Sequence, residues 1–530
     1  MTPTCKPYSL KLNPVFFKNW FALYLWTLLF FAPFIINFLW GNHDWGWVKD
    51  ETPLLSGVFE GRFSQFILQT MLFSGKILPV LTLCIALLFF ALAALLLLDL
   101  WQIPQKSIYI ITLSLFLITS PYILSWLYFA FIILSNLTWP LAIIIACKLL
   151  NQNSSPTNFS LSVILFTLAL GGYPPVINMV GVIFFATALI NLCFDKLSPT
   201  TILKKYIPHA LSAALAVFFF LITQYFLKKY GLQNDTYNTA SISFTNIPEK
   251  LTFCISSAIK QFITPTSFIS SFYKYTTLII FLSAAVKLFQ NLPRGFSAKL
   301  TFILLMSGML LSSVITVFLS ENTSYVLFEP RIEFYGLLYI YFFSFAVLLK
   351  TTDKLAKNVA FSALILLLWY NFSTLSDASK VWKFGMFAET NLANRFLSRL
   401  EQNKNFSPDF PRYTFIQSGT LSLRPKYYHS PTAQKADSYT LTAPYIPWHL
   451  PTKAYQFYYP TSFTAMDFDV YWSFIPFGAP PHTAEFIRYI KENATPWPHQ
   501  NAIYIDHSHI ILTLSPDGIW RASQWLDNNF

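Results

Sequence analysis

Charged residues are scarce in this chain. Only 11% of its 530 residues are Asp, Glu, Lys or Arg, against roughly 25% in a typical soluble domain. Hydrophobic residues make up 54% of the chain and aromatic residues 18%. This balance excludes an ordinary soluble enzyme and indicates a polytopic membrane protein. The net charge of +12 does not call for nucleic acid as a partner, because membrane proteins carry excess lysine on their cytoplasmic side.

Several common signatures are missing as well. The five cysteines are scattered, with none after residue 375, so we expect neither a disulfide framework nor a zinc site. The sequence has no glycine-rich phosphate loop, no dinucleotide-binding fingerprint, no Ser or Cys nucleophile motif and no internal repeat. The first apolar run, at about 18–40, is too long for the apolar core of a signal peptide. We therefore expect it to remain as a membrane span.

Long apolar runs, by contrast, are abundant. A membrane span needs about 20 apolar residues, and we predict eleven spans, of which the third and fifth are short. They cover residues 18–40, 77–99, 106–119, 127–149, 158–171, 174–193, 207–228, 275–290, 299–319, 333–350 and 358–374. The expected fold class is an α-helical polytopic bundle at 1–374, followed by a small mixed α/β domain at 375–530.

The expected tail domain is rich in Pro, Tyr and Trp. Apolar spacing predicts helices at 388–403 and 483–492, a strand at 412–417 and a hairpin at 502–514.

The distribution of charge predicts how the spans are oriented. If the N-terminus is cytoplasmic, the cytoplasmic segments hold fourteen basic and three acidic residues. The segments on the other side of the membrane, up to residue 375, then hold nine basic and nine acidic residues. The positive-inside rule favours this orientation. An odd number of spans then places residues 375–530 outside the cytoplasm.

Three segments on the outer side are polar enough to form a site: the loop 41–76, the interval 229–274 and the loop 320–332. In the interval 229–274, the apolar spacing of residues 246–262 predicts an amphipathic helix. This helix either lies in the membrane interface or caps the bundle. Its expected apolar face is Leu251, Cys254, Ile255, Ala258, Ile259 and Phe262, and its polar face is Lys250, Ser256, Ser257, Lys260 and Gln261. We expect no ionisable residue deep inside a span.

The loop 41–76 concentrates acids. Asp44, Asp50, Glu51 and Glu60 lie there, and Asp44 is flanked by His43, Trp45 and Trp47. An acid in such a loop is either solvated or the base that takes a proton from an attacking hydroxyl. Arginine binds phosphate bidentately, and two of the three arginines before residue 375, Arg62 and Arg331, fall on the same side. The alternative for both arginines is a snorkelling or headgroup-binding role.

Further features are weaker. Gly171 to Pro175, with Tyr173 among them, predicts a tight break between two spans. Asn178 in the next span either faces the bundle interior or is an ordinary hydrogen-bonded core amide. Asp467-Phe468-Asp469 and Asp506-His507-Ser508-His509 contain metal-ligand residue types, but such short motifs carry little weight. No cofactor is expected, and a divalent metal is a minor alternative.

The order of motifs resembles one family: the bacterial and phage membrane glucosyltransferases that modify O-antigen, within the polyprenyl-phosphate-sugar-dependent, GT-C-like glycosyltransferases. The motifs are HDWGW at 43–47, Gly61-Arg62, LALGGYPPVINM at 168–179, NIPEKLTFCISSAIKQF at 246–262 and EPRIEFYGL at 329–337. They span most of residues 20–375. The chain departs from the two adjacent acids usual in the family, because His43 takes the first position.

The resemblance implies a donor of undecaprenyl phosphate linked to a sugar, with glucose expected, and transfer to a glycan acceptor such as O-antigen. The reaction would take place at the periplasmic face of the bacterial inner membrane. Asp44 would be the base, with Asp50 and Glu51 as runners-up, and Arg62 and Arg331 would bind the donor phosphate. Other expected substrate-site residues are His43, Trp45, Trp47, Tyr173, Asn178, Glu329 and Glu333. Expected partners are the lipid-linked donor, the glycan and membrane lipid, without nucleic acid.

Three alternatives remain open at this stage. A polymerase or ligase of lipid-linked oligosaccharides is also polytopic, with large outer loops. A lipid or solute transporter tends to show paired repeats and buried ionisable residues. A non-catalytic glycan-binding protein would be insensitive to loss of the Asp44 carboxylate.

Overall fold

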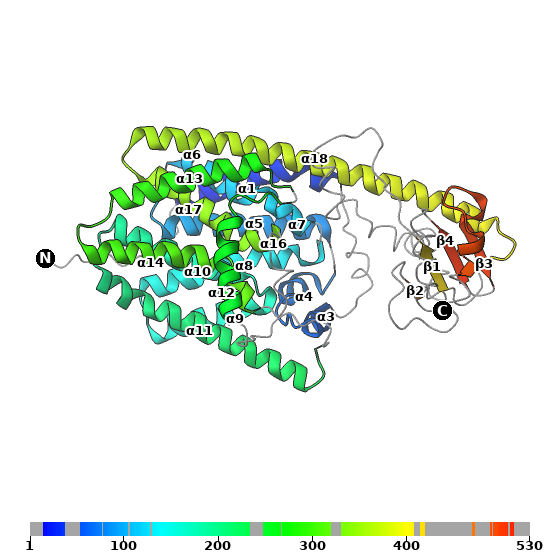
Figure 1. Cartoon of the computed structure of the whole chain (residues 1–530), viewed down its shortest axis with the longest axis horizontal. Coiled ribbons are helices and arrows are strands. Elements are labelled where there is room, and N and C mark those ends of the chain that lie inside the picture. The colour runs from blue at the N-terminus through cyan, green and yellow to red at the C-terminus, as the bar shows by residue number, and fades with distance from the viewer. Residues whose placement is uncertain are drawn as a thin grey trace. The chain divides into compact units, whose positions relative to one another are not determined.

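The computed structural model describes residues 14–37, 53–76, 78–103, 106–127, 130–233, 247–266, 268–319, 330–406, 414–418, 469–471, 488–489, 491–506 and 509–513. The chain divides into two compact units, Met1–Ser376 and Asp377–Phe530. The first is a bundle of helices (Figure 1), and the described part of the second contains a four-stranded sheet.

Helices dominate the described part of the first unit, and the last of them, α18, continues into the second unit. They are α1 (Pro14–Asn37), α3 (Pro53–Phe59), α4 (Ile67–Phe73), α5 (Pro79–Leu100), α6 (Ser107–Ile118), η1 (Pro121–Ile123), α7 (Leu124–Leu127), α8 (Ala130–Gln152), α9 (Pro156–Gly172), α10 (Val176–Cys193), α11 (Pro199–Lys229), α12 (Ile247–Lys260), α13 (Ser271–Gln290), α14 (Phe296–Ser312), α15 (Thr316–Leu319), α16 (Pro330–Tyr335), α17 (Leu337–Lys350) and α18 (Lys354–Glu401).

Nine helical segments of the described chain are long and apolar enough to cross a membrane. Two shorter apolar helices, α9 and α14, complete a set that coincides with the eleven predicted runs. The third run was predicted to be short, but it reaches 21 residues because α6 continues through η1 into α7. The ninth is shorter than predicted, since α14 ends at Ser312. The architecture is therefore that of an α-helical, multi-span membrane protein.

Serine side chains mark the start of several of these helices. Ser155, Ser198 and Ser270 precede α9, α11 and α13, and each hydroxyl accepts a hydrogen bond from the backbone N–H three residues later. Such a cap satisfies one of the four N–H groups that a helix leaves unpaired at its first turn. These caps fix the first turns of the three helices, and α11 starts ahead of the apolar run predicted at 207–228.

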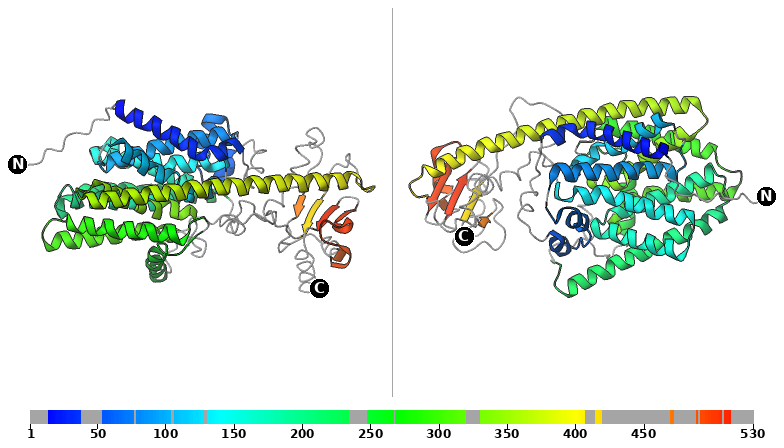
Figure 2. Two further views of the ribbon diagram at one scale, coloured as in Figure 1. Left: turned by 90° about the horizontal axis from the view of Figure 1, so that it is seen from above. Right: turned by 180° about the vertical axis from the view of Figure 1, so that it is seen from behind.

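The bundle has an inner and an outer tier of helices. The span formed by α16 and α17 is the most enclosed, with 94% of its most apolar stretch buried, against 22% for α11. A helix that is apolar all round is buried in this way. Figure 2 shows α1 and α11 at the margins of the bundle.

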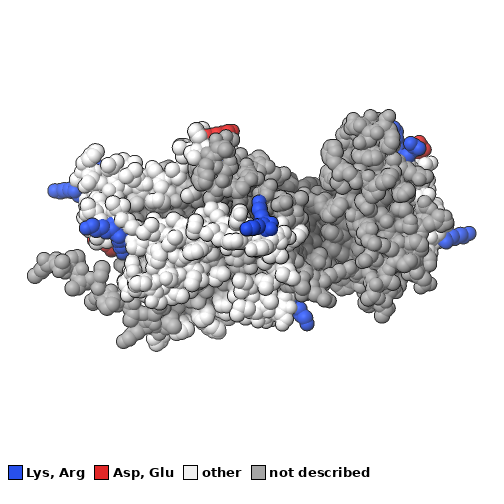
Figure 3. Space-filling view, turned by 90° about the horizontal axis from the view of Figure 1, so that it is seen from below, with Lys and Arg blue, Asp and Glu red and all other residues white. Residues whose placement is uncertain are grey.

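The outer tier presents apolar side chains outward. A broad uncharged surface covers the bundle in Figure 3, with few Lys and Arg side chains. Exposed large apolar residues on α11 and α13 include Leu211, Phe218, Phe219, Phe226, Ile279, Leu282 and Val286. Such a surface is suited to lipid rather than to water.

Ion pairs join the helix ends that the charge distribution predicts to be cytoplasmic. Lys148 on α8 pairs with Asp99 on α5. Lys287 on α13 pairs with Asp353, which precedes α18, at 2.7 Å. These residues belong to segments that the eleven-span arrangement assigns to one side, so the contacts agree with its alternation of helix directions.

The second unit carries the predicted strand and hairpin. The sheet has the order β2-β1-β4-β3, formed by β1 (Thr414–Ser418), β2 (Asp469–Tyr471), β3 (Ile503–Asp506) and β4 (His509–Thr513), with the short helix η4 (Gln500–Ala502) before β3. β1 is parallel to both β2 and β4, and β3 pairs antiparallel with β4. The predicted helix at 388–403 is the C-terminal part of α18 and not a separate element. The predicted helix at 483–492 lies mostly outside the described residues.

Candidate functional site

Several predicted site residues lie outside the described residues. They are His43, Asp44, Trp45, Trp47, Asp50, Glu51 and Glu329. The described candidates are Arg62, Tyr173, Asn178, Arg331 and Glu333. Arg62 and Tyr173 lie in turns between helices, Asn178 on α10, and Arg331 and Glu333 on α16.

Arg62 lies in a tight turn between α3 and α4. Its backbone N–H donates to Gly57 O at 2.7 Å, and the side-chain amide of Gln224 on α11 donates to Gly61 O. Gly61 has φ +75°, and a Cβ there would stand 2.6 Å from Gln233 Nε2. The positive φ favours glycine, which explains Gly61 directly before Arg62, whereas the two glutamine side chains could move aside.

The Arg62 side chain faces a carboxylate and an aromatic ring. Its Nη1 lies 3.4 Å from Glu60 Oε2, and its guanidinium carbon lies 5.7 Å from the centre of the Tyr173 ring. About a quarter of the side chain is exposed, and Nε has no hydrogen-bond partner among the described residues. The guanidinium therefore retains donor capacity for an anion.

The segment after Arg62 packs against the C-terminal end of α9. Ser64 N–H donates to Gly171 O at 3.2 Å. A Cβ on Gly171 would lie 2.3 Å from the Phe63 ring, and one on Gly172 would lie 1.9 Å from Trp139 Nε1. The two glycines thus allow two aromatic side chains to approach the backbone closely, so this break is more than a plain turn.

Tyr173 belongs to a buried aromatic cluster that reaches α16. Its ring centre lies 4.8 Å from that of Trp126, edge to face, and 5.7 Å from that of Tyr335. Aromatic pairs at such separations contribute about 0.5–1.5 kcal/mol beyond burial. The Tyr335 hydroxyl donates to Asn136 O on α8 at 2.7 Å. This cluster connects the Arg62 turn to the helix that carries Arg331 and Glu333.

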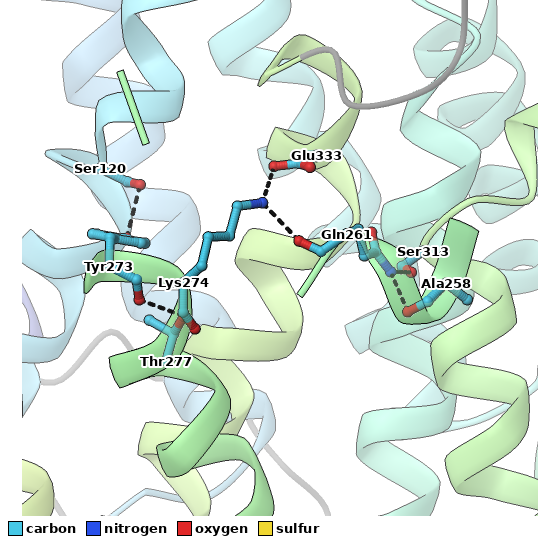
Figure 4. Close-up of polar contacts among 8 residues, drawn as sticks. All are labelled: Ser120, Ala258, Gln261, Tyr273, Lys274, Thr277, Ser313 and Glu333. Atoms are coloured by element: carbon cyan, nitrogen blue, oxygen red, sulfur yellow. Dashed lines mark hydrogen bonds and ion pairs between the residues drawn. The ribbon is translucent and has the colours of Figure 1, made fainter. Parts of the chain in front are cut away.

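Glu333 on α16 forms a buried ion pair with Lys274 on α13 (Figure 4). The Nζ–Oε2 distance is 2.6 Å, and the two side chains are 0% and 4% exposed for Lys274 and Glu333. Lys274 Nζ also donates to Gln261 O at 2.8 Å and lies 5.5 Å from the centre of the Tyr122 ring. Removing two charges from water is costly unless both are paired in this way.

Lys274 is not among the site residues predicted from the sequence, and no ionisable residue is predicted deep inside a span. Both Lys274 and Glu333 are the fourth residues of apolar helices, which places them one turn inside. A usable signal existed, because Lys274 follows the Ser270 cap and therefore belongs to a helix and not to a loop.

Gln261, just after α12, links the buried ion pair to the end of α14. The side-chain amide of Gln261 donates to Ser313 Oγ at 2.6 Å and to Ala258 O at 3.2 Å (Figure 4). The backbone carbonyl of the same residue accepts from Lys274. One residue therefore joins the break after α14 to the buried ion pair.

The predicted faces of α12 are partly wrong. The helix exists and runs across the long helices (Figure 1). Its supposed apolar face is divided, because Cys254 and Ala258 pack against Val314 and Val317 while another row points outward. The outward row is Ile247, Leu251, Ile255 and Ile259. The supposed polar face is largely turned inward, with Lys250, Ser257 and Gln261 buried.

Asn178 has a different environment. It is fully buried on α10, and its side-chain oxygen accepts from Thr316 N–H at 2.9 Å and from Thr316 Oγ1 at 2.6 Å. These bonds hold the start of α15, while the side-chain nitrogen of Asn178 has no hydrogen-bond partner among the described residues. Arg331 is half-buried on α16, two residues before Glu333.

Three segments far apart in the sequence therefore meet at α16. The turn that carries Arg62 reaches it through Tyr173 and Tyr335. The helix α12 reaches it through Ile332, which packs on the α12 cluster. The helix α13 reaches it through the ion pair. This end of the bundle combines two arginines, a buried ion pair and an aromatic cluster, a set that can hold an anionic lipid headgroup.

Metal ligands do not gather in the part of the chain that the structure describes. No group of three or more His, Cys, Asp and Glu side chains there could hold a metal ion. Asp467, His507 and Ser508 lie outside the described residues.

The chain matches no protein-family model, no curated protein and no solved structure.

Proposed function

We propose that this protein is an integral membrane glycosyltransferase. It moves a sugar, with glucose as the first candidate, from a polyprenyl-phosphate carrier to a surface glycan such as O-antigen. The reaction takes place at the outer face of the bacterial inner membrane. In this proposal the bundle is GT-C-like with eleven spans, the N-terminus is cytoplasmic, and the unit after residue 376 helps to bind the acceptor.

One observation carries the proposal: the Arg62 turn, α12 and α13 all meet α16, the helix of Arg331. The same turn follows the acid-rich stretch around Asp44 along the chain. A lipid-linked sugar needs cations for its phosphate and a carboxylate for the acceptor hydroxyl. The meeting of these segments at one end of the bundle supports the first requirement, and the position of Asp44 shortly before the Arg62 turn along the chain is the argument for the second.

The proposed chemistry is a substitution at the anomeric carbon. Asp44 takes the proton from the acceptor hydroxyl. At the same time the oxygen of that hydroxyl bonds to the anomeric carbon of the sugar. The bond from that carbon to the phosphate oxygen breaks, and the phosphate leaves with the electron pair. Arg62 and Arg331 stabilise the charge that develops on the departing polyprenyl phosphate, because charge-assisted and bidentate hydrogen bonds are the strongest available to a phosphate.

Transport is the second candidate, and the buried pair Lys274–Glu333 favours it. Ionisable groups inside membrane spans often mark a substrate or proton pathway. A transporter releases no polyprenyl phosphate and moves its substrate across the bilayer unchanged. A polymerase or ligase, in turn, accepts a lipid-linked oligosaccharide and not a monosaccharide as donor.

The deciding experiment is donor turnover by purified protein in nanodiscs. The donors are polyprenyl-phosphate-glucose, a small panel of other polyprenyl-phosphate monosaccharides and one lipid-linked oligosaccharide, each with candidate acceptor glycans. The readout is released polyprenyl phosphate, compared between wild type and Asp44→Asn. The proposal expects turnover of one monosaccharide donor that collapses in the variant while donor binding persists. Turnover of the oligosaccharide donor alone, or none at all, would overturn it.

A further inference from the structure

A group of buried polar side chains near Arg62 has no hydrogen-bond partners among the described residues. Both amide atoms of Gln65 and both amide atoms of Asn136 are unpaired, as are the indole N–H groups of Trp126 and Trp139. Gln65 is 1% exposed, Asn136 and Trp126 are 0% exposed, and Trp139 is 6% exposed.

These residues lie on segments that meet at one short stretch, Gly171 to Tyr173. Gln65 lies in the turn after Arg62, with its N–H donating to Arg62 O at 3.0 Å. The adjacent Ser64 N–H bonds to Gly171 O. Trp139 Nε1 lies directly over Gly172.

Two further contacts complete the group. Asn136 lies one turn before Trp139 on α8, on the same face of the helix, and its carbonyl accepts from the Tyr335 hydroxyl. Trp126 contacts the Tyr173 ring at 4.8 Å. The residues with unpaired atoms therefore lie in the turn before α4, on α7 and on α8. These three segments meet at the stretch Gly171 to Tyr173.

Leaving these atoms unpaired would be costly. Each buried polar group without a partner costs about 1–3 kcal/mol, and native proteins leave few such groups. Lipid tails offer no hydrogen bonds. A cluster of this kind therefore requires a partner that is itself polar, either ordered water or a bound ligand.

The chemistry of the group indicates which ligand suits it. The two amides each offer a donor and an acceptor, the two indoles offer donors only, and none of these four side chains carries a charge. Aromatic faces of Trp126, Tyr173 and Tyr335 lie alongside. A neutral ring with many hydroxyl groups matches both features, whereas a phosphate would require cations. Arg62 places a cation over Tyr173, at the edge of the group.

We infer that Gln65, Asn136, Trp126 and Trp139 form the subsite for the sugar ring of the lipid-linked donor, with Arg62 at the phosphate end. This inference rests on the proposed function and makes it specific. The hydroxyl groups of the sugar pair with the two amides and the two indoles, and the ring packs on the aromatic cluster. The subsite thereby favours the sugar-bearing lipid over polyprenyl phosphate alone.

The test compares the binding of two probes in nanodiscs: polyprenyl-phosphate-glucose and polyprenyl phosphate without sugar. The variants are Gln65→Met and Asn136→Leu, which keep side-chain volume but remove the hydrogen-bonding atoms, and Trp139→Phe, which removes the N–H. The matched control is Asn191→Leu, because Asn191 is also buried but bonds to the Tyr206 hydroxyl at the other end of α10.

Wild type and the control are expected to bind the sugar-bearing probe at least 10-fold more tightly than the bare lipid. Each variant at the subsite should lower that ratio about 10-fold, without weakening the binding of bare polyprenyl phosphate. Without ligand, Asn136→Leu should unfold at a temperature no lower than wild type, because the native amide has no protein partner to lose. Retained binding of the bare lipid shows in each case that the variant is folded.

Two other outcomes overturn the inference in distinguishable ways. If wild type prefers the sugar-bearing probe and the variants keep that preference, ordered water satisfies these atoms and the sugar binds elsewhere. If wild type shows no preference for the sugar-bearing probe, the subsite and the proposed function fail together.

Discussion

Lys274 and Glu333, 59 residues apart in the sequence, form a 2.6 Å ion pair that is almost completely shielded from solvent. The pair fastens α13 to α16, and through Gln261 it also holds the end of α12. Since α16 carries Arg331, the pair fixes the helix on which a proposed phosphate ligand stands.

Breaking this pair should destabilise the bundle strongly. Glu333→Gln leaves the Lys274 charge buried without its counter-ion, and such a loss costs about 3–5 kcal/mol. Lys274→Met should have a similar effect. The double variant Lys274→Met with Glu333→Leu should recover most of the lost stability, because neither charge remains to be desolvated. Thermal unfolding in detergent measures all three.

The two glycines at the end of α9 give a steric prediction. Gly172→Ala places a Cβ 1.9 Å from Trp139 Nε1, and Gly171→Ala places one 2.3 Å from the Phe63 ring. Overpacking of this kind costs about 1–3 kcal/mol, and it should displace the Arg62 turn that docks there. Donor binding should therefore fall in both variants.

Gly295→Ala is the control for these two variants. A Cβ at Gly295 meets nothing within 4 Å, so the substitution adds only the strain of a residue at φ +130°. Donor binding by this variant should equal that of wild type. If Gly171→Ala and Gly172→Ala also bind donor normally, the docking of the Arg62 turn is irrelevant to the site.

The sequence predicts the spans well because their signal is local. Each apolar run is continuous, and serine caps or prolines stand at several helix starts. The pairing itself carries no local signal: the Ser270 cap indicates that Lys274 is helical, but only the packing of α13 against α16 brings it to Glu333.

The faces of α12 show a second limit of sequence reasoning. A helical period identifies which residues share a face, but it does not distinguish a face that packs on protein from one that contacts lipid. Cys254 and Ala258 pack inward, whereas Ile255 and Ile259 are exposed. In a membrane an apolar face can point outward, so the buried face is free to contain Lys250 and Gln261.

Asp353 gives a prediction about pH. The Lys287 ammonium donates to its carboxylate at 2.7 Å and, with the Ala356 N–H, holds the pKa of that carboxyl below its usual value. A depressed carboxyl pKa stabilises the folded state above the pKa of the unfolded chain, about 3.9. The contribution is lost as the pH falls through the folded-state pKa.

The matching variant is Asp353→Asn. It should unfold at a lower temperature than wild type at pH 7, and the difference should shrink as the pH falls below about 4. A difference that stays constant between pH 7 and pH 3 would show that the carboxylate charge is not the cause.

The proposed orientation can be tested by labelling. In a chain freed of its native cysteines, Lys49→Cys and Lys404→Cys should react with a membrane-impermeant thiol reagent added outside spheroplasts. Arg294→Cys should react only after permeabilisation, because it lies between α13 and α14 on the predicted cytoplasmic side. Labelling of positions 49 and 404 from opposite sides would contradict the eleven-span arrangement.

The most direct test of the central claim is the release of polyprenyl phosphate from a polyprenyl-phosphate monosaccharide by wild type, Arg62→Ala and Arg294→Ala. One lost contact to charge that develops in the transition state costs roughly 3 kcal/mol. The kcat/KM of Arg62→Ala should therefore fall by about 100-fold or more, while Arg294→Ala, which alters an exposed arginine far from the site along the chain, should match wild type. Equal turnover by Arg62→Ala and wild type would contradict the claim that Arg62 holds the donor phosphate.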